Sequence, residues 1–176
     1  MQSLFALANS LSAGILCLQE TFWDADFINE NRDLWDGSIY HSCDGTSKRR
    51  GCAILVSKLY TDSISSPVSD NVGRFVKCSF KYDKVEFDIV SCYAPNSVKE
   101  QNEFYRYLCD SIDHDSSYVL CGDFNDVVDP FCDRSKTLAC YGSATSRLNN
   151  LISKKNLIDV WRYFHPKKSV YEAPSC

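Results

Sequence analysis

Apolar and polar residues recur along this chain with two different periods, which predict helices and strands in alternation. The apolar side chains of residues 4–11 have helical spacing, and the short apolar run 15–18 follows at once, with Gly14 between them to end the helix. Short apolar runs rich in β-branched and aromatic residues are typical of buried strands. Further strands are expected at residues 51–57, 75–82, 85–93 and 118–121, with a hairpin turn between the second and third of these.

The clearest helix is expected over residues 99–112. Ser97 and Glu100 form the S-x-x-E pattern of a capping box at its start. Its main apolar side chains recur every four residues, so they share one face of the helix. These are Phe104, Leu108 and Ile112.

Two shorter helices are expected at residues 147–155 and 159–164, the second ended by Pro166. No repeat, low-complexity tract or linker divides the chain, so residues 1–176 are expected to form one domain, incomplete as described below. Strands and helices are interleaved, but a hairpin intervenes, which favours a mixed α/β layered fold over a purely parallel sheet.

Composition changes this picture little. The chain is 44% hydrophobic and 24% charged, as expected for a soluble globular protein. Its longest apolar runs fall far short of the ~18 residues needed to span a membrane. The amphipathic N-terminus has no basic segment, so it is not expected to be a signal peptide.

The charge restricts how the chain could meet a nucleic acid. Its net charge is −4, from 23 acidic and 19 basic residues, whereas proteins that rely on nonspecific attraction to nucleic acid are usually basic. A polyanionic partner would therefore require a local basic patch and a bound cation.

The chain has ten cysteines but no C-x-x-C pair, so no zinc knuckle is expected. Half of them fall within the predicted strands, where a thiol acts as a small apolar side chain. We expect reduced, structural thiols in an intracellular protein, and a disulfide scaffold is the alternative. The five are Cys17, Cys52, Cys78, Cys92 and Cys121.

Polar residues interrupt the apolar pattern where three predicted strands end, which is where α/β proteins usually place their chemistry. In ILCLQET, Glu20 follows an apolar strand. Its carboxylate could be solvated or could cap the next element, or it could bind a hard cation such as Mg2+.

In VLCGDFND, Asp123 and Asn125 lie two residues apart, so on an extended segment their side chains would share a face. A simple polar turn is the alternative. In SCYAPN, Tyr93 ends a strand and Asn96 leads into a helix. The phenol could be a rim aromatic, or it could donate to a phosphate that Asn96 and nearby backbone N–H groups help to hold.

The ordered segments ILCLQET, GCAILVS, CYAPN, VLCGDFND and DRS resemble the motifs of the endonuclease/exonuclease/phosphatase superfamily. Within it, the chain most resembles the apurinic-endonuclease-like domain of LINE-type (non-LTR) retrotransposons, as does the later segment LIDVWRYFHP. The resemblance covers about residues 4–171. It implies a four-layer α/β/β/α sandwich of two mixed sheets with helices outside.

The resemblance also implies roles for single residues. Glu20 matches the family's metal-binding glutamate, and Asp123 and Asn125 match the pair that positions and activates the attacking water and completes the metal ligands. Tyr93 and Asn96 match residues that contact the scissile phosphate. The implied reaction is hydrolysis of a DNA phosphodiester with Mg2+, or Mn2+ as an alternative ion. One strand is nicked to leave a 3′-hydroxyl, which would prime a downstream reverse transcriptase.

Three basic clusters could contact the DNA backbone, although charge runs are more often solvated surface. The best candidates are Arg49 and Arg50, which with Lys48 directly precede a predicted strand. The other two clusters are Lys154-Lys155 and Lys167-Lys168.

Two parts of the family pattern are missing from this sequence: an opening strand with a metal-binding asparagine, and a final motif with a catalytic aspartate and histidine. Neither Asn9 nor any of the three histidines (His41, His114, His165) is expected to substitute. We therefore expect an incomplete sandwich whose activity is impaired by several orders of magnitude or lost.

Two other functions stay open at this point. One is a phosphatase or phosphodiesterase of the same superfamily that acts on a substrate other than DNA. The other is a non-catalytic remnant that only binds DNA or a partner protein. No membrane association is expected, and an active enzyme of this kind would work in the nucleus.

Overall fold

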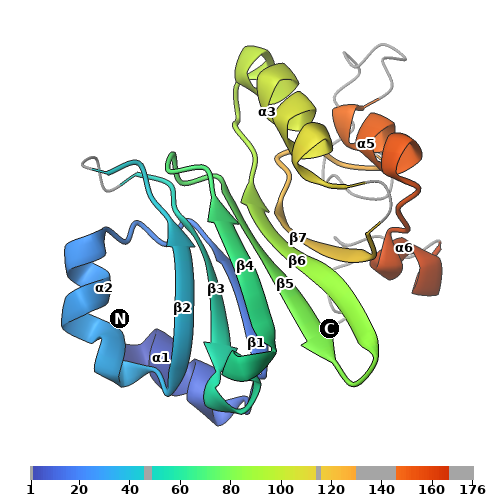
Figure 1. Cartoon of the computed structure of the whole chain (residues 1–176). Coiled ribbons are helices and arrows are strands. Elements are labelled where there is room, and N and C mark those ends of the chain that lie inside the picture. Colours follow the sequence, from blue (N-terminus) through green and yellow to red (C-terminus); the bar gives the residue numbers. More distant parts are fainter. Residues whose placement is uncertain (1, 46–48, 114–115, 130–145, 167–176) are drawn as a thin grey trace, which may run out of the picture. The chain divides into compact units, whose positions relative to one another are not determined.

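Two stacked β-sheets contain most of the hydrophobic core (Figure 1). The computed structural model describes residues 2–45, 49–113, 116–129 and 146–166. In this part of the chain, one sheet has the order β1-β3-β2 and is antiparallel, and the other has the order β4-β5-β6-β7 and is mixed, because β7 runs parallel to β6. The strands are β1 (Ile15–Gln19), β2 (Gly37–Ser42), β3 (Cys52–Ser57), β4 (Ile64–Ser69), β5 (Phe75–Tyr82), β6 (Val85–Tyr93) and β7 (Tyr118–Asp123).

The chain divides into two units. Residues 1–94 and 115–123 form the first unit, which contains both sheets and the helices α1 (Gln2–Ser10) and α2 (Ala25–Asn31). Residues 95–114 and 124–176 form the second unit, which contains α3 (Val98–Ser111), α5 (Arg147–Lys155) and α6 (Val160–Phe164).

Strand β3 is the central strand of its sheet and is buried on both faces. Its side chains alternate between two cores, as the two-residue period of a strand requires. Ile54 and Val56 pack against β5 and β6 of the other sheet, while Ala53 and Leu55 face the helices. This double burial explains the continuous apolar run of β3.

Helices α1 and α2 supply the outer core of the first unit. Phe5 and Ala8 of α1 and Ile28 of α2 pack against β3, together with the indole rings of Trp23 and Trp35. The Trp23 ring stacks on Phe5, with ring centroids 5.6 Å apart. Asp24 begins α2 by accepting a hydrogen bond from the Phe27 amide at 2.8 Å.

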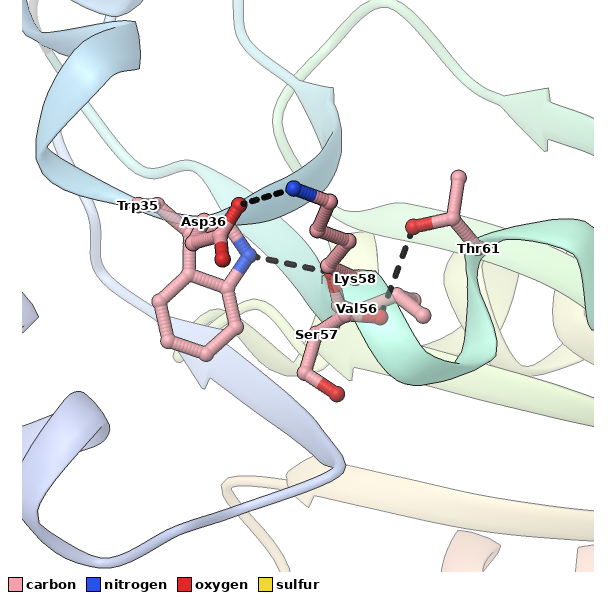
Figure 2. A network of polar contacts seen from close by, with 6 residues as sticks. All are labelled: Trp35, Asp36, Val56, Ser57, Lys58 and Thr61. Carbon is pink, nitrogen blue, oxygen red and sulfur yellow. Dashed lines mark hydrogen bonds and ion pairs between the residues drawn. The ribbon is translucent and has the colours of Figure 1, made fainter.

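Short-range polar contacts close one end of β3, as Figure 2 shows. The Trp35 indole N–H donates to the Val56 carbonyl at 3.1 Å, and the Thr61 hydroxyl donates to the Ser57 carbonyl at 3.4 Å. Lys58 and Asp36 form an ion pair at 3.7 Å. A 3₁₀ segment, η2 (Lys58–Ser63), leads from this end toward β4.

In the second unit, α3 and α5 pack against each other. Leu108 of α3 and Leu148 and Leu151 of α5 are buried. The Lys155 ammonium donates to the Ile112 carbonyl at 2.6 Å, and so satisfies a carbonyl just after α3.

The predicted fold class is confirmed: the chain has two stacked sheets with helices, as expected. The predicted bounds of β5, β6 and α5 agree with the structure, and three elements were not predicted (α2, β2 and β4). Gly14 does not end α1, which stops at Ser10. The capping-box prediction was wrong, because no backbone N–H of α3 donates to the side chain of Ser97.

Within the described residues, no helix combines the length and apolar character needed to cross a bilayer. The seven described cysteines are unpaired thiols, as expected.

Candidate active site

Strands β1, β6 and β7 bring their carboxyl ends together at one end of the sandwich. Tyr93 at the end of β6 pairs with Asp123 at the end of the parallel strand β7. Strand β1 of the other sheet is tied to β6 by the Ser91 hydroxyl, which donates to the Leu18 carbonyl at 3.2 Å and accepts from the Gln19 amide at 3.0 Å. Glu20, which follows β1, and the last residues of β6 and β7, Tyr93 and Asp123, therefore lie at a common edge.

The shortest polar contact at this edge joins Tyr93 and Glu20. The Tyr93 ring is buried in the core between the sheets, and its hydroxyl donates to Glu20 Oε1 at 2.5 Å. The Glu20 side chain itself is exposed. Because the core around the Tyr93 ring prevents it from changing rotamer, the position of the Tyr93 hydroxyl is fixed.

The environment of Tyr93 favours its protonated form. Its pKa is raised first by the hydrogen bond to Glu20, then by burial, and then by the negative charges of Glu20 and Asp123. The nearby Arg74 guanidinium partly opposes this shift. Tyr93 is therefore a hydroxyl donor at neutral pH and not a phenolate.

Arg74 holds Tyr93 from a second side. Its guanidinium donates to the Tyr93 carbonyl at 3.0 Å and lies 5.6 Å from the centroid of the Tyr93 ring, within reach of a cation–π interaction. The backbone amide of Tyr93 donates in turn to the Arg74 carbonyl at 2.9 Å. Arg74 was not predicted from the sequence, where its only signal is its place directly before strand β5.

The backbone around Glu20 is held in an uncommon conformation. Glu20 and Phe22 have φ values of 52° and 54°, in the left-handed region that costs a non-glycine residue of the order of 1 kcal/mol. The loop before β3 holds this turn in place: the Thr21 amide donates to the Gly51 carbonyl at 3.2 Å, and the Phe22 amide donates to the Arg50 carbonyl at 2.8 Å.

Gly51 is required at the centre of this arrangement. Its φ is 114°, and a β-carbon there would lie 2.3 Å from the Thr21 hydroxyl oxygen. The Gly51 amide also donates to the Gly73 carbonyl at 3.0 Å, which ties the loop to the turn between β4 and β5. The turn that carries Glu20 is thus positioned by two other segments of the chain.

The structure brings Glu20, Tyr93 and Asp123 together. The Asp123 carbonyl accepts a hydrogen bond from the Ala94 amide at 2.8 Å, which fixes its backbone beside the end of β6. Its carboxylate is exposed and close enough to affect the pKa of Tyr93. Three polar residues that are far apart in the sequence therefore meet at one edge.

Asn96 and Asn125 belong to the second unit. Asn96 is exposed in the segment that enters α3. Strand β7 ends at Asp123, and Asn125 has a φ of 45°, so the prediction that the two side chains share one face of an extended segment was wrong. The Asn125 carbonyl accepts a hydrogen bond at 3.0 Å from the side-chain amide of Gln101, a buried residue of α3 that also donates to the Pro95 carbonyl.

The predicted basic contacts have different surroundings. Arg49 is exposed, whereas Arg50 is half-buried, and its carbonyl supports the turn after Glu20. Lys154 is exposed, but Lys155 contacts the end of α3 as described above. Lys48, Lys167 and Lys168 lie outside the described residues.

The structure describes two of the three histidines, and each has neighbours other than Glu20, Tyr93 and Asp123. His41 pairs with Ala53 in the β2–β3 ladder, and burial lowers its pKa. The His165 ring lies against Trp161, with centroids 4.2 Å apart. His114 lies outside the described residues.

The donor set at this edge fits a hard divalent cation. Glu20 and Asp123 offer two exposed carboxylates from neighbouring strand ends, and Mg2+ is commonly bound by one or two carboxylates while it retains several waters. Among residues whose positions are described, no three His, Cys, Asp or Glu side chains gather as a fuller metal site would require.

A sequence profile decides the family of this chain. The profile of the Endonuclease/Exonuclease/phosphatase family matches residues 1–150. The chain belongs to this family. It is also similar to the "Transposon TX1 uncharacterized 149 kDa protein" of Xenopus laevis, with 27% identity over 154 residues. That match covers 85% of this chain but only 12% of the transposon protein.

Solved structures of family members share its fold. The AP endonuclease LMAP of Leishmania major superposes with a TM-score of 0.68 at 14% identity, over 95% of this chain and 65% of the enzyme. The endonuclease domain of TRAS1, a telomere-specific non-LTR retrotransposon, gives a TM-score of 0.52 at 14% identity. That superposition covers 88% of this chain and 63% of the TRAS1 domain. The predicted resemblance is thereby confirmed.

Proposed function

We propose that this chain forms the nuclease domain of a LINE-type retrotransposon protein and hydrolyses a DNA phosphodiester with Mg2+ or Mn2+, nicking one strand. The observation that carries the proposal is the convergence of Glu20, Tyr93 and Asp123, in which the Tyr93 hydroxyl donates to Glu20 at 2.5 Å beside Asp123. The similarity to a transposon protein supports the retrotransposon origin.

In this proposal, the residues at the edge bind the cation, the phosphate and the attacking water. Glu20 and Asp123 hold the cation with help from Asn125, and the cation when bound acts as a Lewis acid toward the phosphate. Tyr93 donates its hydroxyl proton in a hydrogen bond to a phosphate oxygen. Asp123 orients the attacking water and accepts its proton, which requires an oxygen–oxygen distance of about 2.6–3.2 Å once substrate is bound.

The remaining predicted residues would position the DNA. Asn96, which directly precedes Ser97 at the start of α3, would hold the scissile phosphate. Arg49 and Arg50 would contact the DNA backbone beside the site and provide the local positive charge that a protein of net charge −4 needs. The chain spans a small part of the transposon protein that it matches. We propose that the parent protein carries a downstream reverse transcriptase domain and that, when active, it works in the nucleus.

A plasmid-nicking assay tests the proposal. Asp123→Asn should lower Mg2+-dependent nicking of supercoiled DNA by about 10²–10⁴-fold, since it removes the group that accepts the proton while keeping its shape. Asp62→Asn is the matched control, because Asp62 is an exposed aspartate of η2, which follows the Ser57 end of β3. Equal and measurable nicking by the two variants would exclude Asp123 from the mechanism, and no Mg2+-dependent nicking by the unmutated chain would exclude the proposed activity. Phosphate release from non-DNA substrates without nicking would assign the chain to another activity of the family.

A further inference from the structure

Cysteine side chains concentrate in the first unit, and they differ in access to solvent. Cys52, Cys78 and Cys92 are buried, at 0% exposure each. Cys17, Cys43 and Cys121 are only half-buried. A soluble oxidant can therefore reach these three thiols and not the three buried ones.

Cys17 and Cys121 lie on strands of different sheets that meet at one side of the sandwich. In the described part of the chain, β1 is one of the two edge strands of the first sheet, and β7 is one of the two edge strands of the second. Some α-carbons of β1 lie within 8 Å of α-carbons of β7, closer than the ~10 Å usual between stacked sheets.

Both thiols face the space between the sheets. Cys17 packs against the core there, and Cys121 pairs in the sheet with Ser91, whose hydroxyl contacts Leu18 and Gln19 of β1. A disulfide requires α-carbons about 4.4–6.8 Å apart and side chains that face each other. Strands β1 and β7 come within 8 Å of each other at their α-carbons, which brings thiols on their facing sides near this range.

We propose that Cys17 and Cys121 form a reversible disulfide that joins the two sheets at this side. With oxidised glutathione as the oxidant, one protein thiolate attacks the glutathione disulfide and releases one glutathione thiol. The second protein thiolate then attacks the mixed disulfide and releases the other. In balance, two protein thiols and one glutathione disulfide yield one protein disulfide and two glutathione thiols.

The cross-link would act at the ends of the strands that carry the candidate site. Cys17 lies three residues before Glu20 on the β1 segment, and Cys121 lies two residues before Asp123 on β7. Joining these strands would fix the separation of the two carboxylates. This consequence for the site rests on the proposed function, whereas the formation of the disulfide does not.

Peptide mapping of the full chain tests the disulfide. The protein is incubated under native conditions with oxidised glutathione, its remaining thiols are blocked, and it is digested without reduction. A cross-linked pair of peptides that contain Cys17 and Cys121 is expected. Cys109→Ser, which removes a half-buried thiol of α3, should leave the pair intact, and Cys17→Ser should abolish it.

Thermal unfolding gives a second measurement on the unmutated chain, so the test does not depend on a cysteine variant that folds. The disulfide would close a loop of about 100 residues, so the oxidised chain should unfold about 5–10 °C higher than the reduced chain, and dithiothreitol should reverse the change. Mixed glutathione adducts at both thiols, or cross-links of either to another cysteine, would overturn the proposal. Mapping needs no nuclease activity, so an inactive chain that forms the cross-link would contradict the proposed function alone.

Discussion

The two ends of strand β3 are built in different ways. At the Ser57 end, Trp35 and Thr61 donate to backbone carbonyls, and the one ion pair shown there in Figure 2 is exposed to solvent. At the Cys52 end, the neighbouring turns contain left-handed residues, among them Glu20 and Arg50, and the exposed carboxylate of Glu20 accepts the Tyr93 hydroxyl.

This difference separates stability from function. At the Ser57 end, the side chains of Trp35 and Thr61 donate to backbone carbonyls of β3, while in the described part of the chain the buried Ser57 hydroxyl has no hydrogen-bond partner. The Cys52 end maintains strained residues because hydrogen bonds from two other segments hold them in place. Strain that the surrounding structure supports in this way is typical of functional sites. Substitutions at the two ends should therefore be distinguished by what they change.

The largest effect on stability is expected at the Ser57 end. Trp35→Ala would remove a buried indole, 5% exposed, and its hydrogen bond to Val56, so it should lower the free energy of unfolding by about 3–5 kcal/mol. Trp161→Ala on α6 is the control: its side chain is 49% exposed, and a change below about 1 kcal/mol is expected. Urea unfolding followed by circular dichroism measures both. Similar losses for the two variants would show that the Ser57 end is not a stability centre.

A somewhat smaller loss is expected at the Cys52 end from Gly51→Ala. The added β-carbon would lie 2.3 Å from the Thr21 hydroxyl oxygen, and the new alanine would have to keep a φ of 114°. We therefore expect the free energy of unfolding to fall by about 2–4 kcal/mol.

Gly45→Ala separates the two causes of this loss. Gly45 also has a positive φ, 83°, but a β-carbon there meets nothing within 4 Å, so only the backbone cost of about 1 kcal/mol applies. Chemical denaturation of both variants gives the comparison. If Gly51→Ala lost no more than Gly45→Ala, the close packing of the turn after Glu20 would not matter for stability.

The sequence predicts the parts of this molecule that are set by local patterns. β5, β6 and α5 each have an uninterrupted period and clear turn or cap residues, and their bounds were predicted. β4 was not, because Pro67 within it argues against a strand. The structure resolves this conflict by placing β4 at the edge of its sheet, where the missing N–H of Pro67 is tolerated.

The residues of the candidate site divide in the same way, into those that local sequence patterns predict and those that they do not. Glu20, Tyr93 and Asp123 each follow or end an apolar run, so the sequence could identify them one by one. Arg74 and Gln101 could not be found in this way, because their contacts depend on pairing between distant segments. Arg74 meets Tyr93 only because β5 is antiparallel to β6, and Gln101 in the sequence is one polar residue among several in a helix.

A change that should leave stability almost intact at neutral pH is Glu20→Gln. It removes the charge that helps to raise the pKa of Tyr93, so this pKa should fall toward its ordinary value of 10.0. Ultraviolet titration of the phenols, compared with the unmutated chain and with Glu86→Gln, an exposed glutamate of β6, measures the shift. An unchanged titration would mean that Glu20 and Tyr93 do not interact in solution.

The sign of the pH dependence follows from the same contact. The pKa of Tyr93 is higher in the folded than in the unfolded chain, so the folded state binds its proton more tightly. The stability from this contact is complete at pH values below the ordinary tyrosine pKa and is lost as the pH rises through the folded-state value. Glu20→Gln should therefore flatten the fall in stability above about pH 10.

The smallest effect is expected from the ion pair at the Ser57 end. The side chains of Lys58 and Asp36 are 78% and 79% exposed, and water and salt screen a pair at 3.7 Å so effectively that Lys58→Met should change the unfolding free energy by less than about 0.5 kcal/mol. The backbone would not be affected, because the Lys58 amide still donates to the Asp36 carbonyl at 2.9 Å. Unfolding in low and high salt is the measurement, with Lys81→Met, an exposed lysine of β5, as the control. A loss above 1 kcal/mol that disappears in high salt would show that charge, and not only packing and backbone hydrogen bonds, stabilises this end of β3.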